Sequence, residues 1–118
     1  MGLTHLDITV RKTPEAPDFR KVECLIETGA TMTVLPDALL AELAIQPHDE
    51  VSFRLADGSR INRKVGRAFV ELQGRGEYTP VVFGEPGDTN LLGVLTLEEL
   101  RLFVDPLHRE LHPLEQQL

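Results

Sequence analysis

Short runs of alternating apolar and polar residues, separated by glycine and proline, constrain the fold of this chain more than any other feature. The sequence contains 9 glycines and 8 prolines, which divide it into short pieces. Residues 6–10 and 51–55 place an apolar residue at every second position, as strands with one buried face do. The pattern therefore predicts a mostly β chain.

The segments expected to form strands are residues 6–10, 19–26, 31–35, 51–55, 61–65, 67–72, 78–83, 102–104 and 109–112. Asp57-Gly58, which stands between two alternating runs, predicts a hairpin with a type I′ turn. Two short helices are also expected. Residues 36–43 form the first, with Pro36 in its first turn, and Thr96 begins the second as the N-cap of a capping box that Glu99 completes.

Length and composition limit the organisation of the chain and its partners. A length of 118 residues is typical of one domain that folds without a disulfide or metal, so we expect a single domain over 1–118. A net charge of −7 and 5% aromatic residues argue against nucleic acid as a partner. One cysteine excludes an internal disulfide and a paired-cysteine zinc site. No membrane-spanning run or signal peptide is seen, so we expect no membrane partner and a cytoplasmic location.

Two segments of the chain repeat the same order of features. In each, a pair of apolar residues is followed by a glycine, a short apolar piece and a helix. The first segment runs from Leu25-Ile26 through Gly29 to the helix at Pro36. The second runs from Leu91-Leu92-Gly93 to the helix at Thr96. This order predicts a pseudo-twofold arrangement of two strand–turn–helix units.

Residues 25–31, Leu-Ile-Glu-Thr-Gly-Ala-Thr, resemble the catalytic loop of the retropepsin-like aspartic proteases, in which two apolar residues precede Asp-Thr-Gly and Ala. Val34-Leu35-Pro36 continues that pattern, and residues 55–58 match the place of the family's flap hairpin. Residues 91–93 are similar to its second apolar-apolar-Gly motif, and the ending is similar to the C-terminal strands of small bacterial members. The resemblance implies the homodimeric acid-protease fold, a closed β-barrel or sandwich with one or two short helices.

The resemblance also implies an aspartic-type endopeptidase that acts on peptide or protein substrates as a homodimer, with no metal and no other cofactor. Because the chain has one such loop, each copy would supply one carboxylate to a site on the twofold axis. Glu27 takes the place of the catalytic aspartate, Thr28 braces the two loops, and Gly29 allows a tight turn. Residues 91–93 would pack beneath the loop. The paired carboxylates would share one proton, because like charges a hydrogen bond apart cannot both ionise.

The residues that would contact substrate follow from the same resemblance. Ala30 and Thr31 match loop residues beside the carboxylate. Ala56, Asp57 and Gly58 match the flap tip, which closes over an extended peptide and excludes water. The resemblance thus implies a substrate site between the loop and the hairpin.

Glu27 departs from the family pattern, which has aspartate at this position. Its carboxylate extends roughly one bond length, ~1.5 Å, further from the backbone, and displacements of ~1 Å can cost ~10²-fold in rate. We therefore expect weak activity unless the backbone recedes. Three interpretations stay open: a natural variant that still works, a natural inactive member of the family, or an engineered substitution. The alternative to an enzyme is a catalytically inactive dimer that retains the fold, or a peptide-binding module.

The remaining candidates for chemistry are expected to be structural. Cys24 is expected to be a buried thiol, and Asp88-Thr89 a solvated turn. His108 and His112 are expected to lie ~13 Å apart along one strand, too far to bind one metal. A basic cluster is expected to form the solvated face of the hairpin, with attraction of acidic peptide as the lesser alternative; its members are Arg60, Arg63, Lys64 and Arg67.

Overall fold

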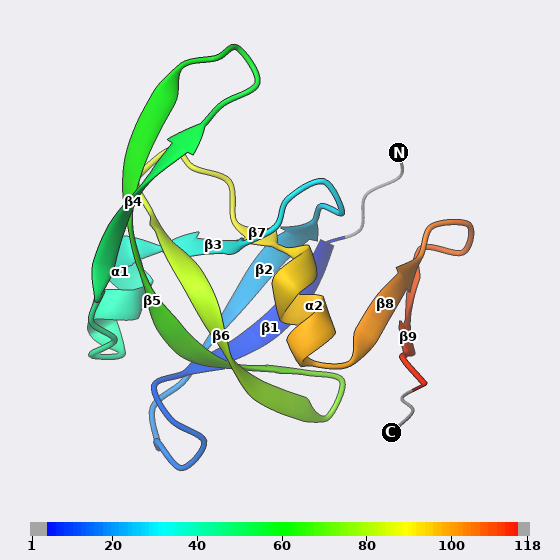
Figure 1. The fold of residues 1–118 in the computed structure, drawn as a ribbon. Helices are drawn as coiled ribbons and strands as arrows, with labels where there is room; N and C mark the ends of the chain where they lie inside the picture. Colours follow the sequence, from blue (N-terminus) through cyan, green and yellow to red (C-terminus); the bar gives the residue numbers. More distant parts are fainter. Residues whose placement is uncertain (1–4, 116–118) are drawn as a thin grey trace.

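The computed structural model describes residues 5–115 and confirms a mostly β chain with two short helices (Figure 1). The elements in chain order are β1 (His5–Arg11), β2 (Arg20–Ile26), β3 (Thr33–Pro36), α1 (Asp37–Glu42), β4 (Asp49–Arg54), β5 (Arg60–Leu72), β6 (Arg75–Gly84), β7 (Leu91–Leu92), α2 (Val94–Glu99), β8 (Leu102–Asp105) and β9 (Glu110–Pro113). Every segment expected to be a strand lies wholly or largely in one of these elements.

Seven strands form one sheet in the order β1-β2-β7-β3-β6-β5-β4, and a further pairing of β1 with β5 closes it into a barrel. Most neighbours are antiparallel, but β7 runs parallel to β2 and β3 runs parallel to β6. The β4–β5 hairpin projects from the barrel, and β8 and β9 form a separate two-stranded sheet beside it (Figure 1). Of the closed barrel or sandwich that the resemblance implies, the structure shows the closed barrel.

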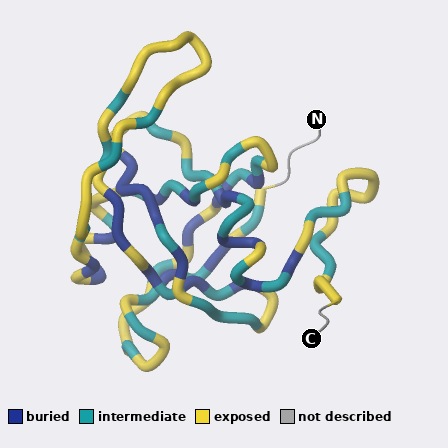
Figure 2. The backbone as a smooth tube through the Cα atoms, in the orientation of Figure 1, coloured by how far each residue is buried: buried dark blue, intermediate teal, exposed yellow. Residues whose placement is uncertain are grey.

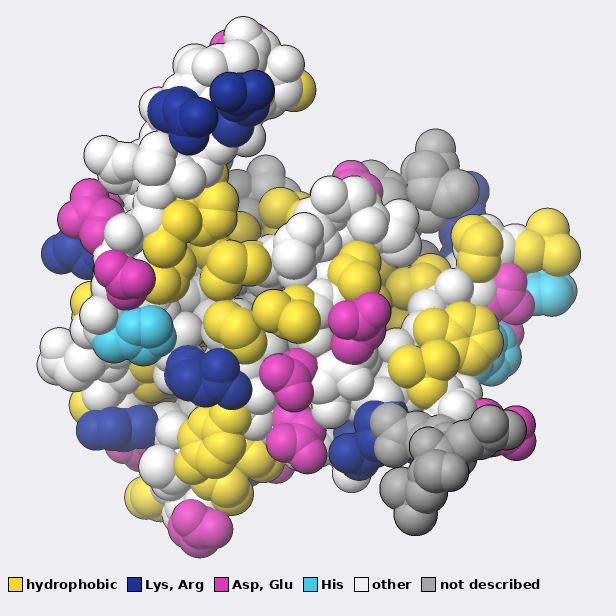
Figure 3. All heavy atoms as spheres, in the orientation of Figure 1, with side chains coloured by type: hydrophobic (Ala, Val, Ile, Leu, Met, Phe, Trp, Pro, Cys, Tyr) yellow, Lys and Arg dark blue, Asp and Glu magenta, His cyan; other side chains and the backbone are white. Residues whose placement is uncertain are grey.

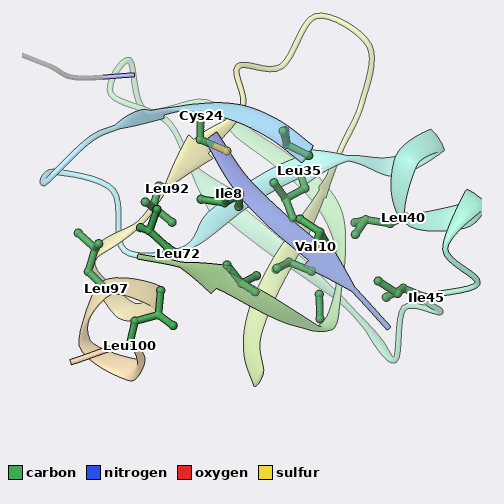
Figure 4. Close-up of a cluster of buried hydrophobic side chains, with 14 of the residues drawn as sticks. Ile8, Val10, Cys24, Leu35, Leu40, Ile45, Leu72, Leu92, Leu97 and Leu100 are labelled. Atoms are coloured by element: carbon green, nitrogen blue, oxygen red, sulfur yellow. The ribbon is translucent and has the colours of Figure 1, made fainter. Parts of the chain in front are cut away.

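Aliphatic side chains from the inward positions of the strands fill the barrel. Ile8 and Val10 of β1, Val70 of β5 and Leu92 of β7 are each at most 1% exposed (Figure 4). Outward positions of β1 alternate with these buried ones, because successive side chains of a strand point to opposite faces. The tips of the β4–β5 and β8–β9 hairpins are exposed (Figure 2). The core therefore lies within the barrel and under the helices.

The β4–β5 hairpin is present, but its turn differs from the predicted one. The Leu55 amide donates to the Ser59 carbonyl over 2.8 Å and the Gly58 amide donates to the Leu55 carbonyl over 2.9 Å. Gly58 has a φ of 88°, whereas Asp57 does not have a positive φ. A type I′ turn needs positive φ at both central residues, so that prediction is wrong. The turn that joins β5 to β6 does have two central residues with positive φ, Gln73 (53°) and Gly74 (75°).

β5 is one strand of 13 residues where the sequence pattern predicts two pieces, 61–65 and 67–72. Gly66 lies between these pieces without interrupting the strand. A Cβ at this position would lie 2.9 Å from the Gln46 carbonyl oxygen. The glycine therefore permits the chain after α1 to pass close to the strand, and the strand continues through it.

α2 begins at Val94 with Gly93 as its N-cap, three residues before the predicted N-cap, so the assignment of Thr96 to that position is wrong. Thr96 lies within the helix and is fully buried. The amides of Val94 and Leu95 donate to the carbonyls of Ala30 and Thr31 over 2.9 and 3.0 Å. Because these carbonyls satisfy two of the first amides of the helix, the helix end does not depend on a capping side chain.

α1 follows β3 directly and covers one end of the barrel. It begins at Asp37, and Pro36 is the last residue of β3 rather than part of the first helical turn. Leu40 and Leu43 are buried against the barrel. Within residues 5–115, neither helix has the length and apolar character needed to cross a membrane.

Candidate active site

A tight turn after β2 carries the residues that the motif predicts to be catalytic. β2 ends at Ile26, and the amide of Ala30 donates to the carbonyl of Glu27 over 3.0 Å, which closes the turn. Thr28 and Gly29 are exposed, and Glu27 is half-buried. The structure thus brings Glu27, Thr28 and Gly29 together at the surface of the protomer.

The Glu27 carboxylate is turned back onto its own loop. Its Oε1 accepts a hydrogen bond from the amide of Gly29 over 3.0 Å. A Cβ at position 29 would lie 3.3 Å from this oxygen, so the glycine leaves room for the carboxylate. Gly29 does not have a positive φ, and its contribution here is space. The side chain therefore takes up its extra methylene by curling back instead of reaching outward.

β7 supports the turn from below. Its parallel pairing with β2 places Leu91 beside Leu25 and Leu92 beside Ile26. The amide of Glu27 also donates to the carbonyl of Leu92 over 3.4 Å. The residues that resemble the second apolar-apolar-Gly motif therefore lie directly against the strand that carries the candidate catalytic loop.

Gly93 allows α2 to approach this loop closely. A Cβ at position 93 would lie 2.5 Å from the carbonyl carbon of Met32 and 2.6 Å from the carbonyl oxygen of Thr31. The amide of Gly93 donates to the Oγ1 of Thr33 over 3.0 Å. Because the obstructing atoms belong to the backbone, they cannot move aside as a flexible side chain would. The contact between helix and loop therefore requires glycine here.

Three buried threonines connect the elements beneath the loop. The Thr33 and Thr96 hydroxyls lie 2.6 Å apart, and the Thr79 and Thr96 hydroxyls lie 2.9 Å apart. All three residues are fully buried, so their hydrogen bonds replace the water that burial removes. Sequence reasoning missed this cluster. The alternation that turns Leu35 inward also turns Thr33 inward, but it does not show which partner the hydroxyl meets.

A cavity of about 430 Å³ separates the loop from the base of the β4–β5 hairpin. Hydrophobic side chains gather in the hollow below the projecting hairpin in Figure 3. The residues that line the cavity are Ala30, Thr31, Met32, Val34, Phe53, Ile61, Arg63, Val82, Asp88, Thr89 and Leu91. Ala30 and Thr31, predicted to contact substrate, are thus brought together with side chains of the hairpin.

The predicted flap-tip residues lie beyond this cavity. Ala56, Asp57 and Gly58 are exposed and do not line it. The Oδ1 of Asp57 accepts hydrogen bonds from the amide and hydroxyl of Ser59 over 2.8 and 2.6 Å. These bonds, that of the hydroxyl first, hold the pKa of Asp57 below its ordinary value. Asp57 therefore stabilises its own turn, and the role of the tip in substrate binding stays a prediction.

An ion pair with two hydrogen bonds borders the cavity and corrects two expectations. Arg63 of β5 donates from Nε to the Oδ2 of Asp88 over 2.8 Å, and from a terminal nitrogen to Oδ1 over 3.0 Å. The Arg63 side chain is 14% exposed, so it does not lie on a solvated face as Arg60, Lys64 and Arg67 do. Asp88 is not a free turn residue, and the hydrogen bond from Arg63 holds its pKa below the ordinary value.

Acidic and histidine side chains meet on the β8–β9 hairpin. Asp105, Glu110 and His112 each place one possible ligand atom within 4.8 Å of the others. His108 Nδ1 lies 2.7 Å from an Asp105 carboxylate oxygen, and His112 Nε2 lies 3.6 Å from the same oxygen. The expectation that both histidines lie far apart on one strand is therefore wrong, because His108 belongs to the turn. The hydrogen bond from His108 lowers the pKa of Asp105, and the absence of a metal stays a prediction.

Cys24 lies on the inward face of β2, as predicted. It is fully buried, and loss of solvation raises the pKa of its thiol to about 12, with smaller contributions from Asp7 and Glu23. A thiol with so high a pKa forms little of the thiolate that acts as a nucleophile. Cys24 therefore contributes to packing and not to the candidate site.

The fold resembles those of two viral proteases. The solution structure of the simian foamy virus (mac) protease is 22% identical, with a TM-score of 0.57 over 80% of this chain and 92% of that one. The structure of the EIAV protease complexed with the inhibitor HBY-793 is 17% identical, with a TM-score of 0.59 over 84% of this chain and 88% of that one. At these identities the likeness shows the fold. No curated protein sequence matches the chain.

The barrel fold and a family match together show the class of the retropepsin-like aspartic proteases. A family model described as "gag-polyprotein putative aspartyl protease" matches residues 18–99, and the chain belongs to this family. The match includes the Glu27 turn, the β4–β5 hairpin and α2, and it ends before β8. The resemblance inferred from the motifs is therefore confirmed at the level of family and fold.

Proposed function

We propose that two copies of this chain form an aspartic-type endopeptidase in which each copy supplies the Glu27 carboxylate to one shared site. The observation that carries this proposal is the exposed turn at residues 27–29, whose carboxylate is oriented by the amide of Gly29. Family membership supports the reaction class. The exposure of Thr28 and Gly29 leaves the turn accessible to a second copy on a twofold axis.

In this mechanism the two Glu27 carboxyl groups share one proton, because two like charges at hydrogen-bond distance cannot both ionise. The ionised group removes a proton from a water molecule, whose oxygen bonds to the carbon of the scissile carbonyl. The protonated group donates its proton to the carbonyl oxygen. When the tetrahedral intermediate collapses, one of its two hydroxyls returns a proton to the second carboxylate as the carbonyl re-forms, the C–N bond breaks, and the departing nitrogen takes the proton that the first group removed. The carboxyl pair returns to its starting state.

The curled side chain affects how well such a pair can form. The hydrogen bond to Gly29 draws the Glu27 carboxylate toward the loop, which partly offsets the greater length of glutamate. The pair must still meet across the axis with both longer side chains, and misplacement by ~1 Å can lower a rate by ~10²-fold. We therefore expect slow cleavage that is favoured in acid, where the shared proton is retained.

Peptide cleavage by four proteins tests the catalytic role. We expect the unchanged chain to cleave a mixed peptide pool slowly and Glu27→Ala to be inactive. Glu23→Gln is the matched control, because it neutralises an exposed carboxylate on β2 and should leave the rate unchanged. Cleavage by Glu27→Asp alone would identify a disabled family member. If none of the proteins cleaved while a control protease did, the alternative of an inactive, peptide-binding dimer would replace this proposal.

Mixing of subunits tests whether the site is shared. We expect the chain to sediment as a dimer at micromolar concentration. Addition of an equal amount of Glu27→Gln chains, followed by exchange, should lower the activity of the unchanged chains to about half, because mixed dimers have one functional carboxylate. A monomeric chain, or activity unaffected by the added variant, would contradict a shared site.

We also propose a cytoplasmic location and no nucleic-acid or membrane partner.

A further inference from the structure

We propose that the Arg63–Asp88 ion pair determines specificity, and that it makes the adjacent cavity accept an uncharged, apolar side chain of the peptide. This inference rests on the proposed function, since it assigns that cavity to substrate. It is carried by the position of the pair. Arg63 and Asp88 are the two charged residues among the described residues that line the cavity, and they neutralise each other there.

The guanidinium of Arg63 is largely occupied. Its Nε and one terminal nitrogen bind Asp88, and the other terminal nitrogen donates to the carbonyl of Asn62 over 2.9 Å. Its side chain is 14% exposed, so little of the cation faces solvent. A hydrogen-bonded, partly buried pair of this kind presents no net charge to a ligand beside it.

Asp88 also shapes the loop on which it lies. Its Oδ2 accepts the amide of Glu85 over 2.8 Å, and its own amide donates to the carbonyl of Glu85 over 2.9 Å. The neighbouring Thr89 and Leu91 line the cavity. Through Asp88, Arg63 therefore holds this wall of the cavity against the base of the β4–β5 hairpin.

The other residues that line the cavity determine which kind of peptide side chain it accepts. Seven apolar residues line the cavity: Ala30, Met32, Val34, Phe53, Ile61, Val82 and Leu91. A charged peptide side chain would lose its hydration in this cavity, and the residue of opposite charge is already paired. Its binding would therefore cost free energy. An aliphatic guest loses only unfavourable contact with water. The intact pair thus selects apolar over acidic side chains.

This selection should reverse when the cation loses its partner. Asp88→Asn removes the principal counter-charge of Arg63. Glu85 would remain nearby, with its Oε1 3.5 Å from Arg63 and its side chain 58% exposed. Asp88→Asn combined with Glu85→Gln therefore leaves Arg63 unpaired at the cavity wall. The preference for glutamate over leucine in a bound peptide should then rise by at least about tenfold.

Peptide binding in a Glu27→Gln background tests this without requiring cleavage. The probes are fluorescein-labelled octapeptides of alanine and glutamine with one central leucine, glutamate or lysine, measured by anisotropy. The matched control is Glu71→Gln, which removes the acid from the ion pair with Arg11, 2.8 Å long and outside the cavity lining. It should leave the leucine-to-glutamate ratio unchanged. The charge reversal Arg63→Asp with Asp88→Arg should restore the preference for leucine.

The outcomes separate this inference from the proposed function. A ratio that moves toward glutamate in the double variant, stays fixed in Glu71→Gln and returns in the charge reversal supports it. A ratio that is unchanged in a folded double variant, while the unchanged chain still cleaves peptides, overturns the inference alone. If no variant bound any probe and the unchanged chain cleaved nothing, the proposed function and this inference would both fall.

Discussion

The two glycine-containing turns of the barrel occupy similar places in the two halves of the chain, but they are packed in opposite ways. Gly29 follows β2 in the first half and is exposed. A Cβ added at Gly29 would lie closest to the Oε1 of Glu27, at 3.3 Å, and this side chain is flexible. Gly93 follows β7 in the second half and is buried, and a Cβ added there would lie 2.5–2.7 Å from backbone atoms of residues 31 and 32. One turn is exposed, and the other is closed within the chain.

This difference shows how the second half of the barrel supports an exposed turn in the first half. The second half supplies β7, the N-terminus of α2 and the buried Thr96, which hold the first turn from below. The first half can then leave Glu27 and Thr28 at the surface without losing its shape. A rigid support under an exposed loop is the arrangement that positions functional groups accurately.

Alanine substitution of Gly93 and Gly29 should show the largest difference in stability between the two turns. We expect Gly93→Ala to lower the free energy of unfolding by about 3 kcal/mol, because its Cβ would collide with backbone. Gly29→Ala should change it by less than about 1 kcal/mol, since the carboxylate of Glu27 can move aside. Urea unfolding of both variants measures the difference. Equal losses would contradict the distinction between an open and a closed turn.

Removal of the central threonine hydroxyl should have the next largest effect. Thr96→Val keeps the shape of the side chain but leaves the hydroxyls of Thr33 and Thr79 without their shared partner. We expect a loss of about 1–3 kcal/mol, the cost of leaving buried polar groups unsatisfied. Thr9→Val on β1 is the control, because Thr9 is half-buried and should cost less. Similar thermal shifts for the two variants would show that the cluster contributes little.

The reactivity of Cys24 reports on opening of the barrel behind the first turn. Burial raises the pKa of this thiol from its ordinary value of 9.0 to about 12, so the native thiol should react with a disulfide reagent at pH 8 only when the barrel opens. Gly93→Ala should accelerate labelling, and Gly29→Ala should not. Folding favours the protonated thiol of Cys24. The contribution of this thiol to the free energy of unfolding is therefore fully present below pH 9 and declines as the pH rises above it. Rapid labelling of the unchanged chain would disprove burial.

The smallest effect is expected at the Arg63–Asp88 pair beside the second half. The hydrogen bond from Arg63 lowers the pKa of Asp88, so its contribution to stability is present above the ordinary value of 3.8 and is lost as the pH falls through the lower, folded value. Asp88→Asn should therefore be less stable than the unchanged chain at pH 7, with a difference that shrinks below pH 3.8. Thermal unfolding across this range checks it. A difference that is constant with pH would exclude the ion pair as its source.

Local patterns predicted much of the fold but not its details of contact. The alternation of polarity located the strands, and the residues around Glu27 and Gly93 indicated the family. The turn at Asp57-Gly58 was assigned the wrong type, because the same residues fit a three-residue loop with one positive φ. Thr96 matched a capping box, but the carbonyls of Ala30 and Thr31, distant in the sequence, satisfy amides of the first helical turn instead.

The sequence by itself determined which segments form strands and which loop carries the acid, because periodicity and motif are properties of neighbouring residues. The tertiary structure alone decided that Thr96 joins Thr33, 63 positions away, and that Arg63 pairs with Asp88, 25 positions away. It also decided that the Glu27 carboxylate turns back to Gly29. These contacts depend on how the closed barrel brings distant strands together, and that closure depends on the packing of the whole core.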